Sequence, residues 1–412
     1  MAIFLMLFSF FSSFNANEGI RYEDFAYNPK IKTIRLFPAS DNPDIKMLPP
    51  VTLLGGSPLQ LEFDDLQEDR VNYYAKIISC NYDWSKSSLH DLDFLKTYNE
   101  FNIDSYEYSS NTSIPYVHYK FIIPSVAIPG NYVIAVYQDG DFDQLILTKR
   151  FMVSSETVQV KQEAKYGMSS FKATNQQMSF LVNYHGVDIP NPLETVNVVI
   201  RQNQRWDNAQ INIKPSFVRE ANKILEYRFF NNEKNFQGGN EFRFVDFTSL
   251  NYPGQNTGSL ERNREGELQL SVALDVPRSG ERYAQYRDLN GGYIIINKDA
   301  GEGESTCNYL NVNFSLKTAQ QYNTDVYVLG AFNNWRLDPS NKMTYSNGVY
   351  QCYLLLKQGF YNYMYVTANP NEDIEGSFFE TENFYEIFVY NRSMYPNADL
   401  LVGYFSFTAN PR

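Results

Sequence analysis

Apolar and polar residues alternate along several stretches of the chain. Val312, Phe314 and Leu316 share one face of a predicted strand, and the same two-residue period recurs in residues 268–274 and 145–153. This period is typical of strands that have one buried and one polar face. The pattern therefore predicts half-buried strands in widely separated parts of the chain.

A more continuous apolar run covers residues 131–137, between a turn at Pro129-Gly130 and a polar turn at 138–141. Such a run, bounded by turn residues, predicts a strand buried on both faces. No window keeps a helical stripe, and we expect at most a short helical turn within residues 89–98. Short strands with regular turn signals predict an all-β chain of tandem immunoglobulin-like or early-set β-sandwich domains.

The chain of 412 residues is too long for one core, and about 150 residues per domain predicts three folded units. Polar and glycine-rich stretches suggest where they divide. We expect a signal peptide at 1–16, an N-terminal β-sandwich at 21–153, a middle β-sandwich at 158–297, a linker at 298–305 and a C-terminal early-set β-sandwich at 306–412.

The signal peptide is predicted from an uncharged apolar run at residues 2–14, followed by Phe14-Asn15-Ala16 as a cleavage site. The run is shorter than the roughly 20 residues that span a bilayer. It lacks a basic start, as a truncated signal would. We therefore expect an exported mature protein that begins near Asn17.

The formal net charge is −12. This charge disfavours nucleic acid and anionic membranes as direct partners, because both would repel it. Aromatic residues make up 16% of the chain, which suits strands and protein interfaces. The composition thus favours a protein partner, with neither nucleic-acid binding nor direct membrane insertion.

The three cysteines are Cys80, Cys307 and Cys352, and none forms a Cys-x-x-Cys pair. With only three histidines in the chain, the spacing excludes a structural zinc site and a c-type haem, and we expect no metal and no cofactor. The sequence leaves two alternatives open for Cys307 and Cys352, a disulfide or buried free thiols.

The sequence has none of the common catalytic motifs, such as Gly-x-Ser-x-Gly or His-Glu-x-x-His. Asp64, Asp65, Glu68 and Asp69 form an acidic cluster, which we interpret as a solvated loop after a strand at residues 59–63. We therefore predict that the protein is not an enzyme. A hydrolase remains as an alternative that would need Ser, His and Asp, or two carboxylates, to converge in the fold.

A local motif runs from Asp325 to Trp335 and contains Gly330-Ala-Phe-Asn-Asn-Trp335, and a tyrosine-rich strand follows it. This layout resembles the early-set immunoglobulin-like domains of glycogen-binding modules. The resemblance implies glycan stacking by the motif tryptophan and the rings on one face of that strand, and the alternative is that these rings pack the sandwich. The candidate glycan-stacking residues are Trp335, Tyr361, Tyr363 and Tyr365.

A second resemblance covers nearly the whole mature chain. Its most specific blocks lie, in order, at Ile34–Pro38, Pro50–Gly55, Leu61–Leu66, Asn72–Tyr74, Ile77–Trp84, Tyr108–Thr112, Tyr116–Tyr119, Gly130–Tyr137 and Arg150–Val153. In this order and spacing they resemble the type IX secretion system plug protein family. Within the blocks, Cys80, Asn81, Trp84 and Tyr119 are interpreted as framework residues rather than as contacts.

The family resemblance implies a non-enzymatic periplasmic protein that is associated with the outer membrane through its partner. That partner is the large β-barrel translocon of the type IX secretion system, whose periplasmic opening the protein would bind and seal. The alternative function is a carbohydrate-binding accessory protein that uses the C-terminal domain.

Overall fold

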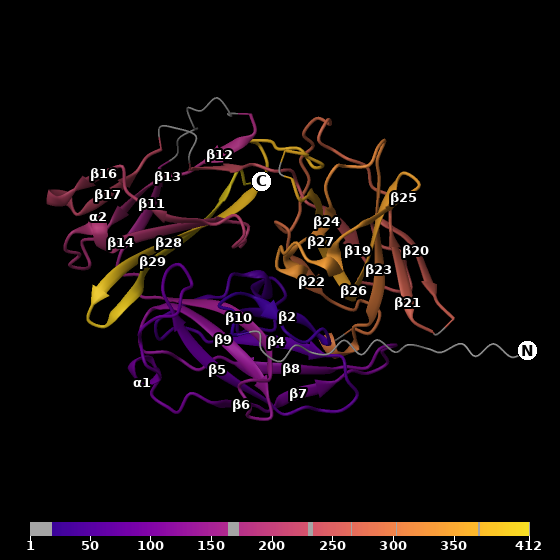
Figure 1. Cartoon of the computed structure of the whole chain (residues 1–412), viewed down its shortest axis with the longest axis horizontal. Coiled ribbons are helices and arrows are strands. Elements are labelled where there is room, and N and C mark those ends of the chain that lie inside the picture. The colour runs from indigo at the N-terminus through magenta and orange to yellow at the C-terminus, as the bar shows by residue number, and fades with distance from the viewer. Residues whose placement is uncertain are drawn as a thin grey trace, which may run out of the picture.

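The computed structural model describes residues 19–163, 173–229, 234–264, 266–301, 303–369 and 371–411. The predicted signal peptide at 1–16 lies outside these residues. Strands are the main secondary structure of the described part, at 46% against 6% helix, which confirms the predicted all-β class. Figure 1 shows three lobes, with the first below, the second at the upper left and the third at the right.

The first lobe is a sandwich of two sheets. One has the strand order β1-β10-β9-β5-β6, with β3 parallel to β10, and the other has the order β2-β4-β8-β7. The bounds are β1 Phe25–Ala26, β2 Ile31–Pro38, β3 Val51–Leu53, β4 Leu59–Asp65, β5 Tyr73–Cys80, β6 Phe101–Ile103, β7 Ser105–Tyr108, β8 Val117–Ile122, β9 Gly130–Gln138 and β10 Leu145–Ser154, with the short helices η1 Ile45–Met47 and α1 Asp91–Phe94.

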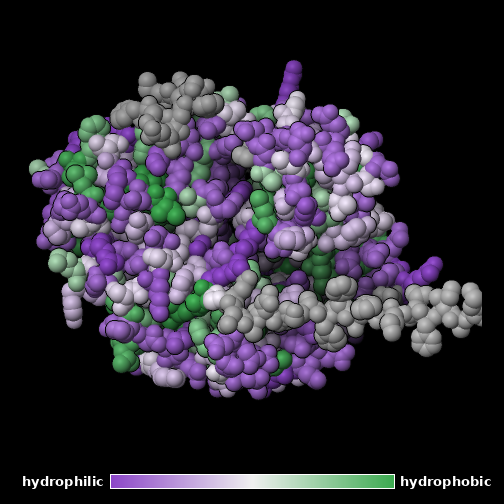
Figure 2. Space-filling model, viewed as in Figure 1, coloured by the Kyte–Doolittle hydropathy of each residue, from purple (hydrophilic) through white to green (hydrophobic). Residues whose placement is uncertain are grey.

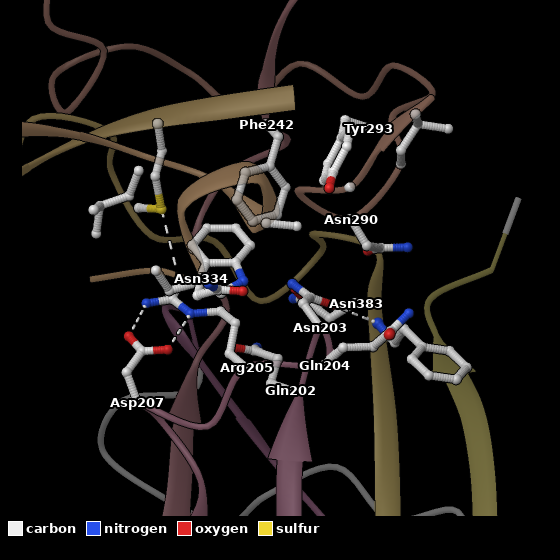
Figure 3. Close-up of a pocket in the computed structure, with 18 of the residues that line it drawn as sticks. Gln202, Asn203, Gln204, Arg205, Asp207, Phe242, Asn290, Tyr293, Asn334 and Asn383 are labelled. Carbon is white, nitrogen blue, oxygen red and sulfur yellow. Dashed lines mark hydrogen bonds and ion pairs between the residues drawn. The ribbon is translucent and has the colours of Figure 1, made fainter. Parts of the chain in front are cut away.

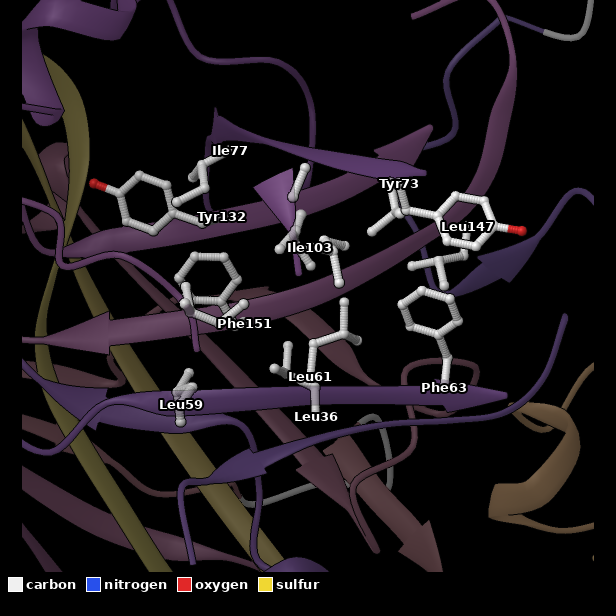
Figure 4. Close-up of a cluster of buried hydrophobic side chains, with 14 of the residues drawn as sticks. Leu36, Leu59, Leu61, Phe63, Tyr73, Ile77, Ile103, Tyr132, Leu147 and Phe151 are labelled. Atoms are coloured by element: carbon white, nitrogen blue, oxygen red, sulfur yellow. The ribbon is translucent and has the colours of Figure 1, made fainter. Parts of the chain in front are cut away.

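The core of this lobe follows from the two-residue period. On β4, Leu59, Leu61 and Phe63 point between the sheets and are almost fully buried (Figure 4). Phe63 stacks on Tyr119 with ring centroids 5.0 Å apart. Burying each such side chain stabilises the fold by about 1.5–3 kcal/mol. Because side chains alternate along a strand, Glu62 and Asp64 must face the other way.

The second lobe combines strands from two distant parts of the chain. One sheet has the order β11-β13-β17-β16, the other β15-β14-β28-β29, and β12 pairs with β18. The bounds are β11 Gln159–Glu163, β12 Asn175–Gln177, β13 Ser179–Asn183, α2 Pro192–Thr195, β14 Val196–Gln202, β15 Gln210–Ile213, β16 Phe217–Arg219, η2 Glu220–Asn222, β17 Ile224–Tyr227, β18 Asn235–Gln237, β28 Asn383–Met394 and β29 Asn397–Ala409.

The third lobe lies between the two parts of the second in the sequence. One sheet has the order β20-β21-β23-β26-β25, and in the other β27 pairs with β19, β22 and β24. The bounds are β19 Arg243–Asp246, β20 Thr257–Arg262, β21 Leu268–Val272, β22 Tyr293–Ile295, η4 Glu304–Thr306, β23 Tyr309–Lys317, β24 Val326–Leu329, η5 Ala331–Asn333, η6 Pro339–Asn341, β25 Thr344–Ser346, β26 Val349–Lys357 and β27 Gly359–Thr367.

The sheets do not follow the predicted division into a middle unit at 158–297 and a C-terminal unit at 306–412. Strand β28 pairs with β14 along seven residues, and β21 pairs in parallel with β23 across the predicted linker. Strand β14 is buried along its whole length, so it needs a neighbour on each edge, and β28 supplies one. The second lobe is therefore discontinuous, and the third is an insertion within it.

Two further expectations are corrected. Asp64 and Asp65 belong to β4 and are fully buried, so they are not part of a solvated loop. The predicted linker at 298–305 includes the start of η4, whose Glu304 packs against the first lobe.

All three cysteines are buried free thiols, which excludes the disulfide alternative. Burial raises the pKa of Cys80 and of Cys307 to about 12, so both thiols stay protonated and unreactive at neutral pH.

Candidate functional site

The outward face of the first lobe's second sheet carries ionisable side chains that meet the third lobe. Asp64 accepts hydrogen bonds from Lys357 at 2.7 Å and from Tyr309 at 2.6 Å. Its other carboxylate oxygen lies 2.6 Å from Nδ1 of His118, on the neighbouring strand β8. Lys357 and Asp64 are both fully buried. One carboxylate thus joins β4 and β8 of the first lobe to β23 and β26 of the third.

A second group of charges extends this contact. Glu62 lies two residues before Asp64 on the same face of β4 and pairs with Arg35 at 2.5 Å and with Lys46 at 3.1 Å. Arg35 and Lys46 also pair with Glu304 of η4. The two cations and the two carboxylates balance, which buried charges require. We call these residues the lower joint: Arg35, Lys46, Glu62, Asp64, His118, Glu304, Tyr309 and Lys357.

Three residues of the lower joint have the composition of a metal site. One ligand atom each from Glu62, His118 and Glu304 lies within 4.8 Å of the others. However, both carboxylates already bind Arg35 and Lys46, and a divalent cation there would add two charges to a neutral group. Ion pairing therefore describes these residues better than metal binding does.

The buried carboxylates of the lower joint make the stability of the fold depend on pH. Burial alone would raise the pKa of Asp64, but Lys357 and His118 outweigh it and hold the pKa below its usual value. At Glu304, burial would likewise raise the pKa, but the neighbouring Arg35 outweighs burial, and the pKa is lowered. Their contribution to stability is complete above the unfolded-state pKa of about 4 and is lost as the pH falls through the folded-state values.

We therefore expect Tm to fall as the pH is lowered from 7 to 2.5, with most of the fall below about pH 4, as measured by circular dichroism. The Asp64→Asn variant lacks one of these titrating groups, so its Tm should fall less between the two pH values than that of the wild type. A Tm that stays constant or rises on acidification would contradict this assignment.

The first and second lobes meet through arginines and aromatic rings. The guanidinium of Arg150, on β10, lies 4.5 Å from the ring centroid of Trp84 and 5.3 Å from that of Trp206. Arg201, on β14, lies 4.4 Å from the Trp206 centroid and binds Glu386 through two hydrogen bonds of 2.6 and 2.8 Å. We call Trp84, Arg150, Arg201, Trp206, Glu386 and Phe388 the upper joint. Arg201 is thus both stacked and bidentate, which holds its guanidinium in a fixed geometry.

A cleft of about 1490 Å³ lies where the three lobes meet. Figure 2 shows it as a hollow near the centre of the face, surrounded largely by hydrophilic side chains. Amide side chains such as Gln202, Asn203 and Gln204 line it, together with Asn290 and Asn334 (Figure 3). Apolar side chains such as Phe242 and Met364 also line it, so the cleft has a mixed polar and apolar lining.

Charged residues in the cleft are largely paired with one another. Lys149 binds Asp24 at 2.7 Å, and Arg205 binds Asp207 at 2.6 Å. The described residues that line the cleft include neither His nor Cys. The Ser, His and Asp arrangement of the hydrolase alternative is thus not found in the described lining, whereas Glu372, Asp373 and Glu375 do line the cleft, so the form with two carboxylates stays a prediction.

The structure places the four candidate glycan-stacking residues in or beside the core of the third lobe. Tyr361, Tyr363 and Tyr365 are each 1% exposed. The hydroxyl groups of Tyr363 and Tyr365 both donate to Asp275, at 2.7 and 2.9 Å. Rings that are buried to this extent have no face left for a sugar, so the stacking prediction is wrong for the three tyrosines.

Trp335 lines the cleft but is only 7% exposed. The Arg205 guanidinium lies 4.4 Å from its ring centroid, and Phe242 packs beside it at 5.5 Å. A Cβ at Gly291 would lie 2.2 Å from a carbon of its ring, so this close approach requires glycine. These contacts fit the packing alternative, while a glycan role for Trp335 stays a prediction.

Sequence reasoning missed both joints. The available signal was the alternation of Gln60, Glu62 and Asp64, which puts three polar side chains on one face once the strand predicted at 59–63 is extended to Asp65. Such a face is usually solvated, and only the fold shows that the third lobe covers it. The framework interpretation of Trp84, Cys80 and Tyr119 agrees with their burial, although Trp84 also forms the upper joint.

No helix within the described ranges is both long enough and apolar enough to cross a membrane.

The three-lobed all-β architecture occurs in a protein of known structure. The crystal structure of a hypothetical protein from Parabacteroides merdae, at 2.30 Å resolution, matches with a TM-score of 0.86 and 26% sequence identity. The match covers 95% of this chain and 100% of that chain. No curated protein matches the chain. The class is therefore an all-β protein of three joined sandwiches.

Residues 31–155 match the family described as "Type 9 secretion system plug protein 1st domain". The first lobe is thus similar to the first domain of plug proteins, and this match supports the resemblance to the type IX secretion plug family over residues 31–155. The matched segment contains Arg35, Glu62, Asp64 and His118 of the lower joint, and Trp84 and Arg150 of the upper joint.

Proposed function

We propose that the protein is a non-enzymatic periplasmic plug, which binds and seals the periplasmic opening of the outer-membrane translocon barrel of the type IX secretion system. The observation that carries the proposal is the plug-family match over the first lobe. Secretion through a wide barrel requires that the idle pore be closed, and a soluble protein can close it by shape alone.

The two joints supply the stiffness that such a stopper needs. Moving the third lobe away from the first would break the buried Asp64–Lys357 pair, and moving the second lobe away would separate Arg150 from the ring of Trp206. The charge-assisted hydrogen bond and the cation–π contact form only while the lobes stay together, so both oppose opening. Three lobes held this way present one rigid body to the barrel, and little ordering is needed on binding.

Deleting the gene should make the outer membrane permeable to antibiotics that are normally too large to enter. We expect at least a severalfold lower inhibitory concentration of a large glycopeptide antibiotic, restored by the full chain in trans. Complementation with Tyr252→Ser, a change at an exposed loop residue of the third lobe, serves as the control. Unchanged permeability in a strain with an assembled translocon would contradict the proposal.

A further inference from the structure

The two most exposed large apolar side chains of the described chain are neighbours. Met394 and Tyr395 are each 94% exposed, at the tip of the β28–β29 hairpin. The same hairpin is fully buried at Val389, Tyr390 and Leu401. In Figure 1 its free end reaches the left edge of the molecule, above α1. Two adjacent apolar side chains that contact so little of their own protein suggest a binding surface.

The tip is held in place by polar contacts. Arg392 donates to Asn397 across the hairpin at 2.7 Å, and the Ser393 hydroxyl donates to the carbonyl of Tyr395 at 2.9 Å. The Ser88 hydroxyl of the first lobe donates to the carbonyl of Asn397 at 3.0 Å. The tip is thus fixed to two lobes before any partner arrives. A preorganised turn loses little entropy on binding.

The chemistry of the tip favours an apolar pocket on a protein partner over a lipid surface or a second copy of this chain. Met and Tyr are enriched in the buried centres of protein interfaces. An anionic lipid surface would require unpaired basic residues around the tip, but Arg392 pairs with Asp399, and Lys76 of the first lobe pairs with Asp91. A second copy of this chain would bring another net charge of −12 and be repelled.

We propose that Met394 and Tyr395 anchor the protein in an apolar socket on the periplasmic side of the translocon barrel. This inference rests on the proposed plug function and assigns it a contact surface. The hairpin tip supplies the apolar centre of the interface, and the surrounding polar groups form its rim.

The test is affinity capture of the barrel from detergent-solubilised outer membrane, using the full tagged chain and identifying the barrel by mass spectrometry. We expect Met394→Ser/Tyr395→Ser to retain at least tenfold less barrel than the wild type, with an unchanged Tm. The matched control is Tyr252→Ser, which removes another exposed tyrosine, 76% exposed, from the third lobe. It should retain as much barrel as the wild type.

The outcomes separate this proposal from the plug function. If the wild type captures no barrel, the plug function itself fails. If the wild type and the double variant capture the barrel equally, the plug function stands and the tip proposal is overturned. Two further results would also overturn it: tip-dependent flotation with phosphatidylethanolamine–phosphatidylglycerol vesicles, or tip-dependent dimerisation in analytical ultracentrifugation.

Discussion

Replacing Lys357 by methionine should destabilise the folded chain by about 3–5 kcal/mol, because the change leaves the carboxylate of Asp64 buried without its main counter-charge. Both groups are fully buried and lie 2.7 Å apart. The ammonium of Lys357 also lies 4.3 Å from the ring centroid of Tyr116, so a cation–π contact is lost with it. We expect a clearly lower midpoint of guanidinium chloride denaturation.

Lys342 provides the matched control. It pairs with Asp325 at 2.8 Å, but both side chains are about half exposed. Surface pairs of this kind contribute at most about 1 kcal/mol, so Lys342→Met should hardly move the midpoint. Equal shifts for the two variants would show that the lower joint does not hold the first and third lobes together.

The second large effect is expected at the upper joint. Arg201→Met removes both hydrogen bonds to Glu386, whose side chain is fully buried, and the contact with the Trp206 ring. The isolated carboxylate should again cost about 3–5 kcal/mol. The double variant Arg201→Met/Glu386→Met removes the whole ion pair, and we expect it to recover most of the lost stability because no charge is left unpaired.

Arg70 provides the exposed control for Arg201. It also has an acidic partner, Asp104, and an aromatic contact, because its guanidinium lies 4.7 Å from the ring centroid of Tyr106. Arg70→Met should change the free energy of unfolding by less than about 1 kcal/mol. A double variant no more stable than Arg201→Met would count against an ion-pair origin of the effect. Loss of packing or of the stacked guanidinium would then be the cause.

The alternation of apolar and polar residues was sufficient to predict the fold class. Strands β23, β21 and β10 lie where the two-residue period placed them, and β9 is the buried strand expected at 131–137. The alternation also separates the inward and outward faces of β21 and β23 correctly, whereas a bulge between Leu145 and Leu147 interrupts it in β10. It carries no information about which strand lies next to which, and for this reason the division between the second and third lobes was wrong.

The lower joint could not be predicted for a related reason. Asp64 and Lys357 are 293 residues apart in the sequence, and a polar strand face is the same whether water or another domain covers it. The tyrosines of β27 show the converse error. Tyr361, Tyr363 and Tyr365 share one face, as expected, but that face is directed into the third lobe rather than towards a ligand. Periodicity identifies a face, whereas tertiary packing decides what meets it.

The discontinuous second lobe has a consequence for biogenesis. Arg201 and Glu386 lie 185 residues apart, so a polypeptide that emerges amino end first can complete the first lobe while the second still lacks two strands. Early folding of the inserted lobe would draw the two halves together and reduce the entropy lost when they join. A premature stop codon near the carboxyl end would thus remove two strands and leave a whole lobe unfinished and exposed to proteases.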